Sequence, residues 1–117
     1  MKKIYYLKSC DTCKRILKSI DDLNQFKLID IKTNPITQDD LNLLYQQTKS
    51  FEKLFNKRAQ LYKERDLKNK NLTEEDYKNL ILEHYTFLAR PIIWFNDVLF
   101  VGNAAKVVNE MLEKVNR

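Results

Sequence analysis

Residues 4–20 read IYYLKSCDTCKRILKSI, and this stretch determines the fold class. Residues 4–7 are apolar or aromatic and favour β structure, so they predict a strand that is buried on both faces. Apolar side chains then recur at every third or fourth position from Cys13 to Ile20, which is typical of one face of a helix. Phe26–Ile31 predicts a second strand. A strand–helix–strand unit of about 30 residues indicates that the two strands are parallel.

The middle of the chain, residues 37–88, is predicted to be all-helical. Capping boxes that begin at Thr37 and Thr73 mark two helix starts. His84, the single histidine, continues the apolar face of the second of these helices, so we expect it to be packed or partly buried rather than catalytic.

The last part of the chain returns to strands after Pro91. Two short apolar runs, Ile92–Phe95 and Val98–Val101, are joined by Asn96-Asp97, which is typical of a tight hairpin. Asn103 is expected to cap a final helix. The order β-α-β, helical insertion, β-β-α predicts an α/β protein with a thioredoxin-like fold.

Length and composition indicate one globular domain, residues 1–117, with the helical insertion at about 37–88. The chain has no apolar run long enough for a membrane span and no recognisable signal peptide, so we expect a cytoplasmic protein without membrane contact.

The formal charge is +5, and residues 49–70 account for the excess with eight basic and three acidic residues. This segment either attracts an anionic substrate, an acidic protein or nucleic acid, or is a solvated, lysine-rich surface.

Cys10 and Cys13 are the only cysteines, and they lie at the predicted start of the first helix. Free backbone N–H groups and the helix dipole lower the pKa of a thiol at this position, and the thiolate is the reactive form. In a reducing cytosol, redox chemistry is therefore the better interpretation of the pair. The alternative for Cys13 is a structural role, in which it only packs on the apolar face of the helix. Two cysteines and one histidine fall short of the roughly four ligands of a zinc site.

Four motifs together resemble the ArsC/Spx family, which includes glutaredoxin-coupled arsenate reductases and the Spx regulators of Gram-positive bacteria. They are the segment around Ser9-Cys10-Asp11-Thr12-Cys13-Lys14, Asn56-Lys57-Arg58 with Tyr62, Leu88-Ala89-Arg90-Pro91-Ile92, and Val101-Gly102-Asn103. The resemblance covers nearly the whole chain. It implies that Cys10 is the nucleophile, that Arg58 and Arg90 bind an oxyanion or stabilise the thiolate, and that Pro91 follows a cis peptide bond.

The chain departs from the arsenate reductase pattern in two places. Those enzymes have a third arginine after the hairpin, where this sequence reads Gly102-Asn103-Ala104. They also rely on an external thiol and do not require Cys13, whereas Spx regulators use a Cys-x-x-Cys pair as a redox switch.

The resemblance implies a thiol–disulfide oxidoreductase with Cys10, Cys13 and Arg90 as catalytic residues and Arg58 and Arg90 as substrate-binding residues. Cys10 attacks a small oxyanion or a disulfide, and Cys13 or an external reductant (glutathione, glutaredoxin or thioredoxin) resolves the adduct, with no bound cofactor or metal. The alternative is an Spx-like regulator in which the redox state of the pair controls binding to RNA polymerase. We do not expect direct DNA binding in either case.

Overall fold

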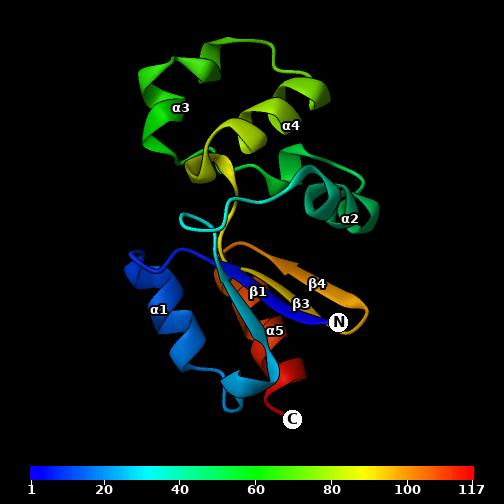
Figure 1. Cartoon of the computed structure of the whole chain (residues 1–117). Coiled ribbons are helices and arrows are strands. Elements are labelled where there is room, and N and C mark those ends of the chain that lie inside the picture. Colours follow the sequence, from blue (N-terminus) through cyan, green and yellow to red (C-terminus); the bar gives the residue numbers. More distant parts are fainter. The chain divides into compact units, whose positions relative to one another are not determined.

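The computed structural model describes residues 1–117, which form two compact units. Unit 1 consists of residues 1–34 and 90–117, and unit 2 consists of residues 35–89 (Figure 1). Every strand belongs to unit 1, whereas the regular elements of unit 2 are all helical. None of the helices is both long and apolar enough to cross a membrane.

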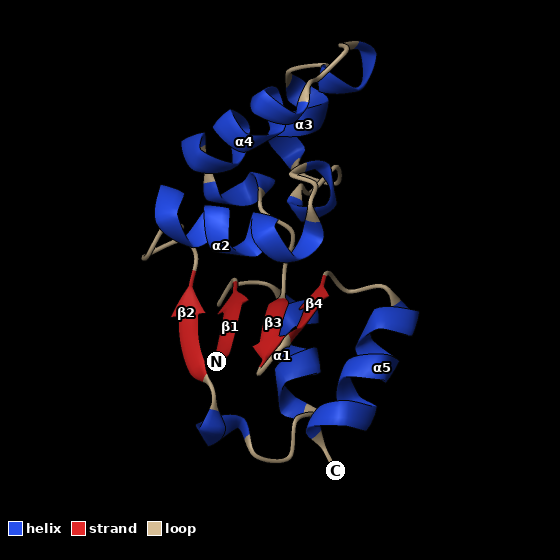
Figure 2. Ribbon diagram, turned by 90° about the vertical axis from the view of Figure 1, so that its right-hand side faces the viewer, coloured by secondary structure: helices blue, strands red, loops and turns tan.

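Unit 1 contains a four-stranded sheet in the order β2-β1-β3-β4 (Figure 2). Its strands are β1 (Lys2–Tyr6), β2 (Lys27–Asp30), β3 (Ile92–Phe95) and β4 (Val98–Val101). The predicted parallel pairing of the first two strands is confirmed, and β3 is antiparallel to both of its neighbours. Asn96 adopts the left-handed conformation with a φ of 55° in the hairpin turn, a backbone region that Asn tolerates better than most residues.

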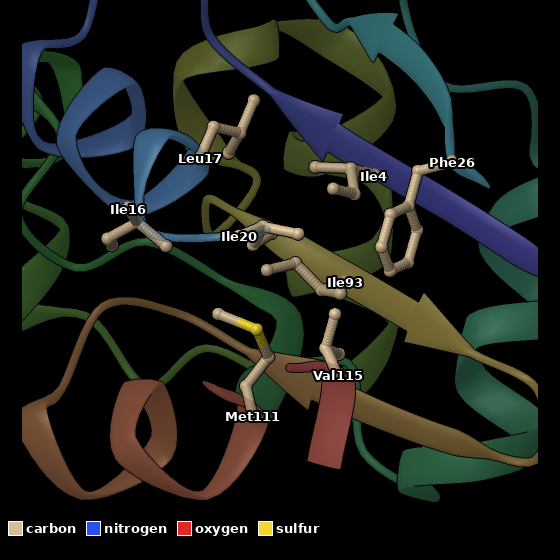
Figure 3. Close-up of a cluster of buried hydrophobic side chains, with 8 residues drawn as sticks. All are labelled: Ile4, Ile16, Leu17, Ile20, Phe26, Ile93, Met111 and Val115. Atoms are coloured by element: carbon tan, nitrogen blue, oxygen red, sulfur yellow. The ribbon is translucent and has the colours of Figure 1, made fainter. Parts of the chain in front are cut away.

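Two helices, α1 (Asp11–Lys18) and α5 (Ala105–Val115), pack against one face of this sheet (Figure 3). Ile4 of β1 is paired with Ile93 of β3, and the two helices cover both side chains almost completely. The remaining members of this core are Ile16, Leu17, Ile20, Phe26, Met111 and Val115. Each fully buried aliphatic side chain of this size contributes about 1.5–3 kcal/mol.

The side chain of Asn116 joins the ends of these two helices. Its Oδ1 accepts the backbone N–H of Asp21 at 2.9 Å, and its Nδ2 donates to the carbonyl of Ser19 at 2.8 Å. Ser19 is the C-terminal cap of α1, so this amide satisfies a carbonyl that has no partner within the helix.

Unit 2 contains α2 (Gln38–Thr48), α3 (Gln60–Glu64) and α4 (Glu74–Glu83), separated by short 3-10 turns. The Thr37 hydroxyl accepts the N–H of Asp40 at 3.1 Å, and Thr73 forms the complete predicted capping box with Asp76. Aromatic rings fill the interior, where Phe55 packs against its neighbours with centroid distances of 5.8, 4.9 and 5.3 Å. These neighbours are Tyr62, Tyr77 and Phe87, respectively.

Two sequence predictions of helix boundaries were wrong. His84 does not continue α4: it is the extended residue that ends the helix, and its Nδ1 accepts the N–H of Thr86 at 3.2 Å at the start of the next 3-10 turn. It is partly buried, as expected. Asn103 does not cap α5, because the N-cap is Ala104, which supplies no side-chain hydrogen bond. The predicted α/β, thioredoxin-like element order is otherwise confirmed.

Candidate functional site

The nucleophile predicted from the sequence, Cys10, lies just beyond the carboxyl end of β1 and is the N-cap of α1. A tight turn leads to it, closed by a hydrogen bond of 3.0 Å from the Cys10 N–H to the carbonyl of Leu7. The carbonyl of Cys10 then accepts the N–H of Lys14 at 3.1 Å, which is the first bond of the helix. Cys10 is free and partly buried, so a small reagent has access to its sulfur.

The surroundings of Cys10 favour its thiolate. Burial raises the pKa of the thiol, but four contacts together outweigh this effect and bring the pKa below its ordinary value. They are the backbone N–H of Cys13, the Cys13 thiol, the Arg90 guanidinium and the backbone N–H of Thr12. The two backbone donors are orphan N–H groups of the first helical turn, as expected for a thiolate at a helix N-terminus.

Cys13 has the opposite character. It is 0% exposed, and burial raises its pKa to about 11. The backbone N–H of Leu7 opposes this shift, the negative charge and hydrogen bond of Cys10 add to it, and the charge of Arg90 lowers it. At neutral pH Cys13 is therefore a thiol that donates to Cys10. The pair thus consists of one accessible sulfur with thiolate character and one shielded, protonated sulfur.

The strand register explains how Arg90 reaches Cys10. Tyr5 is paired with Ile92, so the start of β3 lies beside the carboxyl end of β1. Arg90 is two residues upstream of Ile92, at the same edge of the sheet, and its guanidinium bonds the sulfur of Cys10. The Arg90–Pro91 peptide bond is cis, as the family resemblance implies.

The structure therefore brings Cys10, Cys13 and Arg90 together within unit 1. Arg58 belongs to unit 2, where it is exposed and lies just before α3. Its backbone N–H donates to Asn56 Oδ1 at 3.1 Å, and Asn56 Nδ2 donates to the carbonyl of Thr86 at 3.1 Å. The substrate-binding role of Arg58 stays a prediction.

Some of the groups that act on the cysteines were not identified from the sequence. The N–H groups of Leu7 and Thr12 contact the sulfurs through the backbone, so their residue types carry no signal of this role. No group of three or more His, Cys, Asp or Glu side chains is arranged to hold a metal ion.

Comparison with known proteins places these features in context. The model of the ArsC family matches residues 5–111. A relative from Haemophilus influenzae, described as an uncharacterized protein, is 33% identical over 103 residues, which cover 85% of this chain and 88% of the relative.

Solved structures share the fold along nearly the whole chain. A Staphylococcus aureus protein with a solution NMR structure has a TM-score of 0.75 at 29% identity, and the match covers 94% of this chain and 97% of that one. An arsenate reductase from Vibrio cholerae has a TM-score of 0.74 at 22% identity over 96% and 95% of the two chains.

Proposed function

Because this chain belongs to the ArsC family, we propose that it is a thiol–disulfide oxidoreductase in which Cys10 is the nucleophile. The observation that carries the proposal is the contrast between the two cysteines at the start of α1. Cys10 is accessible and bonded by two backbone N–H groups and Arg90, whereas Cys13 is buried and protonated one turn away. The arsenate reductase-like fold supports a thiol-dependent redox role.

In the first step of the proposed reaction, the Cys10 thiolate attacks one sulfur of a disulfide substrate. The substrate S–S bond breaks, a mixed disulfide forms on Cys10, and the other substrate sulfur leaves as a thiolate that takes a proton from solvent. Attack occurs at Cys10 because Cys13 is inaccessible and is almost entirely a thiol at neutral pH.

In the second step, Cys13 loses its proton and attacks the sulfur of Cys10. The remaining substrate sulfur leaves with that proton, and an intramolecular disulfide remains, so the dithiol has supplied two electrons. Mixed-disulfide formation removes the negative charge of Cys10, which is one cause of the raised pKa of Cys13. The first step therefore makes the second step easier.

Two equivalents of an external thiol, such as glutathione, or the dithiol of glutaredoxin or thioredoxin, would return the pair to its reduced state. We propose the cytoplasm as the location because its pool of reduced thiols can supply these electrons. A small oxyanion is the alternative substrate. The Arg90 guanidinium beside Cys10 suits an anionic group in either case, and we retain Arg58 as a second proposed anion-binding residue on its match to the family pattern.

The test is to mix the reduced protein with excess oxidised glutathione, quench with acid and measure the intact mass. We expect the wild type to close a Cys10–Cys13 disulfide, Cys13→Ala to retain one glutathione, and Cys10→Ser to take up none at neutral pH. Glutathione uptake by Cys10→Ser at the rate of Cys13→Ala would contradict the assignment of the nucleophile.

Turnover separates an enzyme from a redox-controlled binding protein. With glutathione, glutathione reductase and NADPH in excess, an oxidoreductase consumes NADPH continuously as a disulfide substrate is added. A single round of disulfide formation without turnover would favour the regulatory interpretation and would contradict the proposed enzyme.

A further inference from the structure

We propose that Asp30 is a positioning residue for Cys10, because its carboxylate holds the turn that presents the nucleophile. This inference rests on the proposed role of Cys10 as the reacting sulfur. Asp30 has no role in the sequence motifs described above, and its place becomes apparent only from the strand register.

The parallel pairing of β1 and β2 places Asp30 near the site. Tyr6 is paired with Asp30, and the N–H of Ile31 donates to the carbonyl of Tyr6 at 2.9 Å. Both strands therefore end at the same edge of the sheet, where the arrowheads of β1 and β2 lie in Figure 2. The chain leaves β1 at this edge and enters the turn to Cys10.

The carboxylate of Asp30 connects this turn to the segment that follows β2. Its Oδ1 accepts the backbone N–H of Lys8 at 3.4 Å and that of Lys32 at 3.3 Å. Its Oδ2 accepts the hydroxyl of Thr33 at 3.5 Å. Each bond is long, but together they attach one partly buried carboxylate to two neighbouring loops.

The tethered turn controls both sulfurs. Lys8 lies inside the turn that the Cys10 N–H closes onto the Leu7 carbonyl, and the N–H of Leu7 contacts the sulfur of Cys13. The direction of the Cys10 side chain toward the N–H groups of Thr12 and Cys13 depends on this backbone. Loss of the tether should therefore weaken the contacts that stabilise the thiolate.

Charge and geometry act in opposite directions at Asp30, which makes the proposal testable. A carboxylate near the turn opposes a second negative charge on Cys10, whereas its acceptor oxygen holds the turn in place. Asp30→Asn keeps an acceptor oxygen and removes the charge. Asp30→Ala removes both.

The experiment measures the rate of Cys10 alkylation by iodoacetamide against pH in the full-length reduced protein. The buried Cys13 contributes little below its pKa of about 11. For Asp30→Ala we expect the pKa of Cys10 to rise and alkylation at neutral pH to slow about fivefold, the equilibrium effect of one typical net hydrogen bond. For Asp30→Asn we expect the pKa of Cys10 to stay equal or fall.

Asp22→Ala is the matched control, because this exposed carboxylate precedes β2, at the end of the strand remote from Asp30. It should leave the Cys10 profile unchanged. Equal alkylation profiles for the two Asp30 variants would overturn the proposal. A raised pKa of Cys10 in Asp30→Asn would also overturn it, and this outcome can be measured even if Asp30→Ala does not fold. Alkylation does not require disulfide exchange, so inactivity toward oxidised glutathione would contradict the proposed function and leave this inference standing.

Discussion

Raising the pH from about 8 to about 11 should destabilise the protein through Cys13. In the unfolded chain this thiol loses its proton near the ordinary value of 9.0, whereas in the folded protein it keeps the proton up to about 11. The native state therefore binds more protons over this window, and the free energy of unfolding falls as the pH rises. Two pKa units at about 1.4 kcal/mol each set an upper limit of about 3 kcal/mol, and a loss of about 1–3 kcal/mol is expected.

The assay is urea unfolding in the presence of a reductant, followed by circular dichroism at several pH values, for the wild type and Cys13→Ala. Lysine and tyrosine side chains are common to both proteins, and the window from pH 9 to pH 11 lies above the lowered pKa of Cys10, which Cys13 also contacts, so the change over this window reports mainly on Cys13. The wild type should lose stability relative to Cys13→Ala between about pH 9 and pH 11. The reasoning would be refuted if the free energy of unfolding of the wild type, minus that of Cys13→Ala, stayed constant or increased with pH over this window.

Cys10→Ser provides a control with the opposite sign. The folded-state pKa of Cys10 is lowered, so its contribution to stability should be gained as the pH rises toward 9.0. If the free energy of unfolding of the wild type, relative to that of Cys10→Ser, fell as the pH rose toward 9.0, the lowered pKa of Cys10 would be contradicted.

Three further predictions concern the site and its support. Arg90→Gln should raise the pKa of Cys10, because a bond to the thiolate is lost, and the iodoacetamide profile should shift to higher pH; an unshifted profile would exclude the contact. Ile93→Ala should reduce the free energy of unfolding by about 2–5 kcal/mol in urea, since the side chain is only 2% exposed in the core of unit 1; a loss below 1 kcal/mol would disagree with that burial. Thr73→Ala should cost about 1 kcal/mol through loss of the capping box, with Thr73→Ser restoring most of it; no loss in either variant would argue against the cap.

Secondary structure was predictable where periodicity and turn chemistry agreed. The apolar run of β1, the helical spacing after Cys13 and the Asn96-Asp97 turn each point to one structure, and each is present. Helix ends were less predictable because local hydrogen bonds decide them. His84 continues the apolar pattern of α4, yet its side chain accepts a backbone N–H of the following turn, which a periodic pattern cannot indicate.

The site was predictable to the extent that side-chain identity carries the chemistry. The Cys-x-x-Cys spacing and the helix start predict a reactive Cys10, and the family pattern adds Arg90. The backbone donors Leu7 and Thr12 could not be identified, since any residue other than proline supplies an N–H. Asp30 could not be identified from the sequence either, because its contact with Lys8 depends on which residues of two parallel strands face each other.

The division of the chain into two units has a consequence for its synthesis on the ribosome. Unit 2 is one continuous segment, so it can be complete before β3, β4 and α5 have been made, whereas unit 1 must wait for residues 90–117. Cys10 is made before unit 2, but Arg90 is added only after the whole of unit 2, and Asn116, which secures the end of α1, comes still later. Until Arg90 has been added, the thiolate of Cys10 lacks one of the four contacts that lower its pKa, so we expect the nascent cysteine to be less reactive than the folded one.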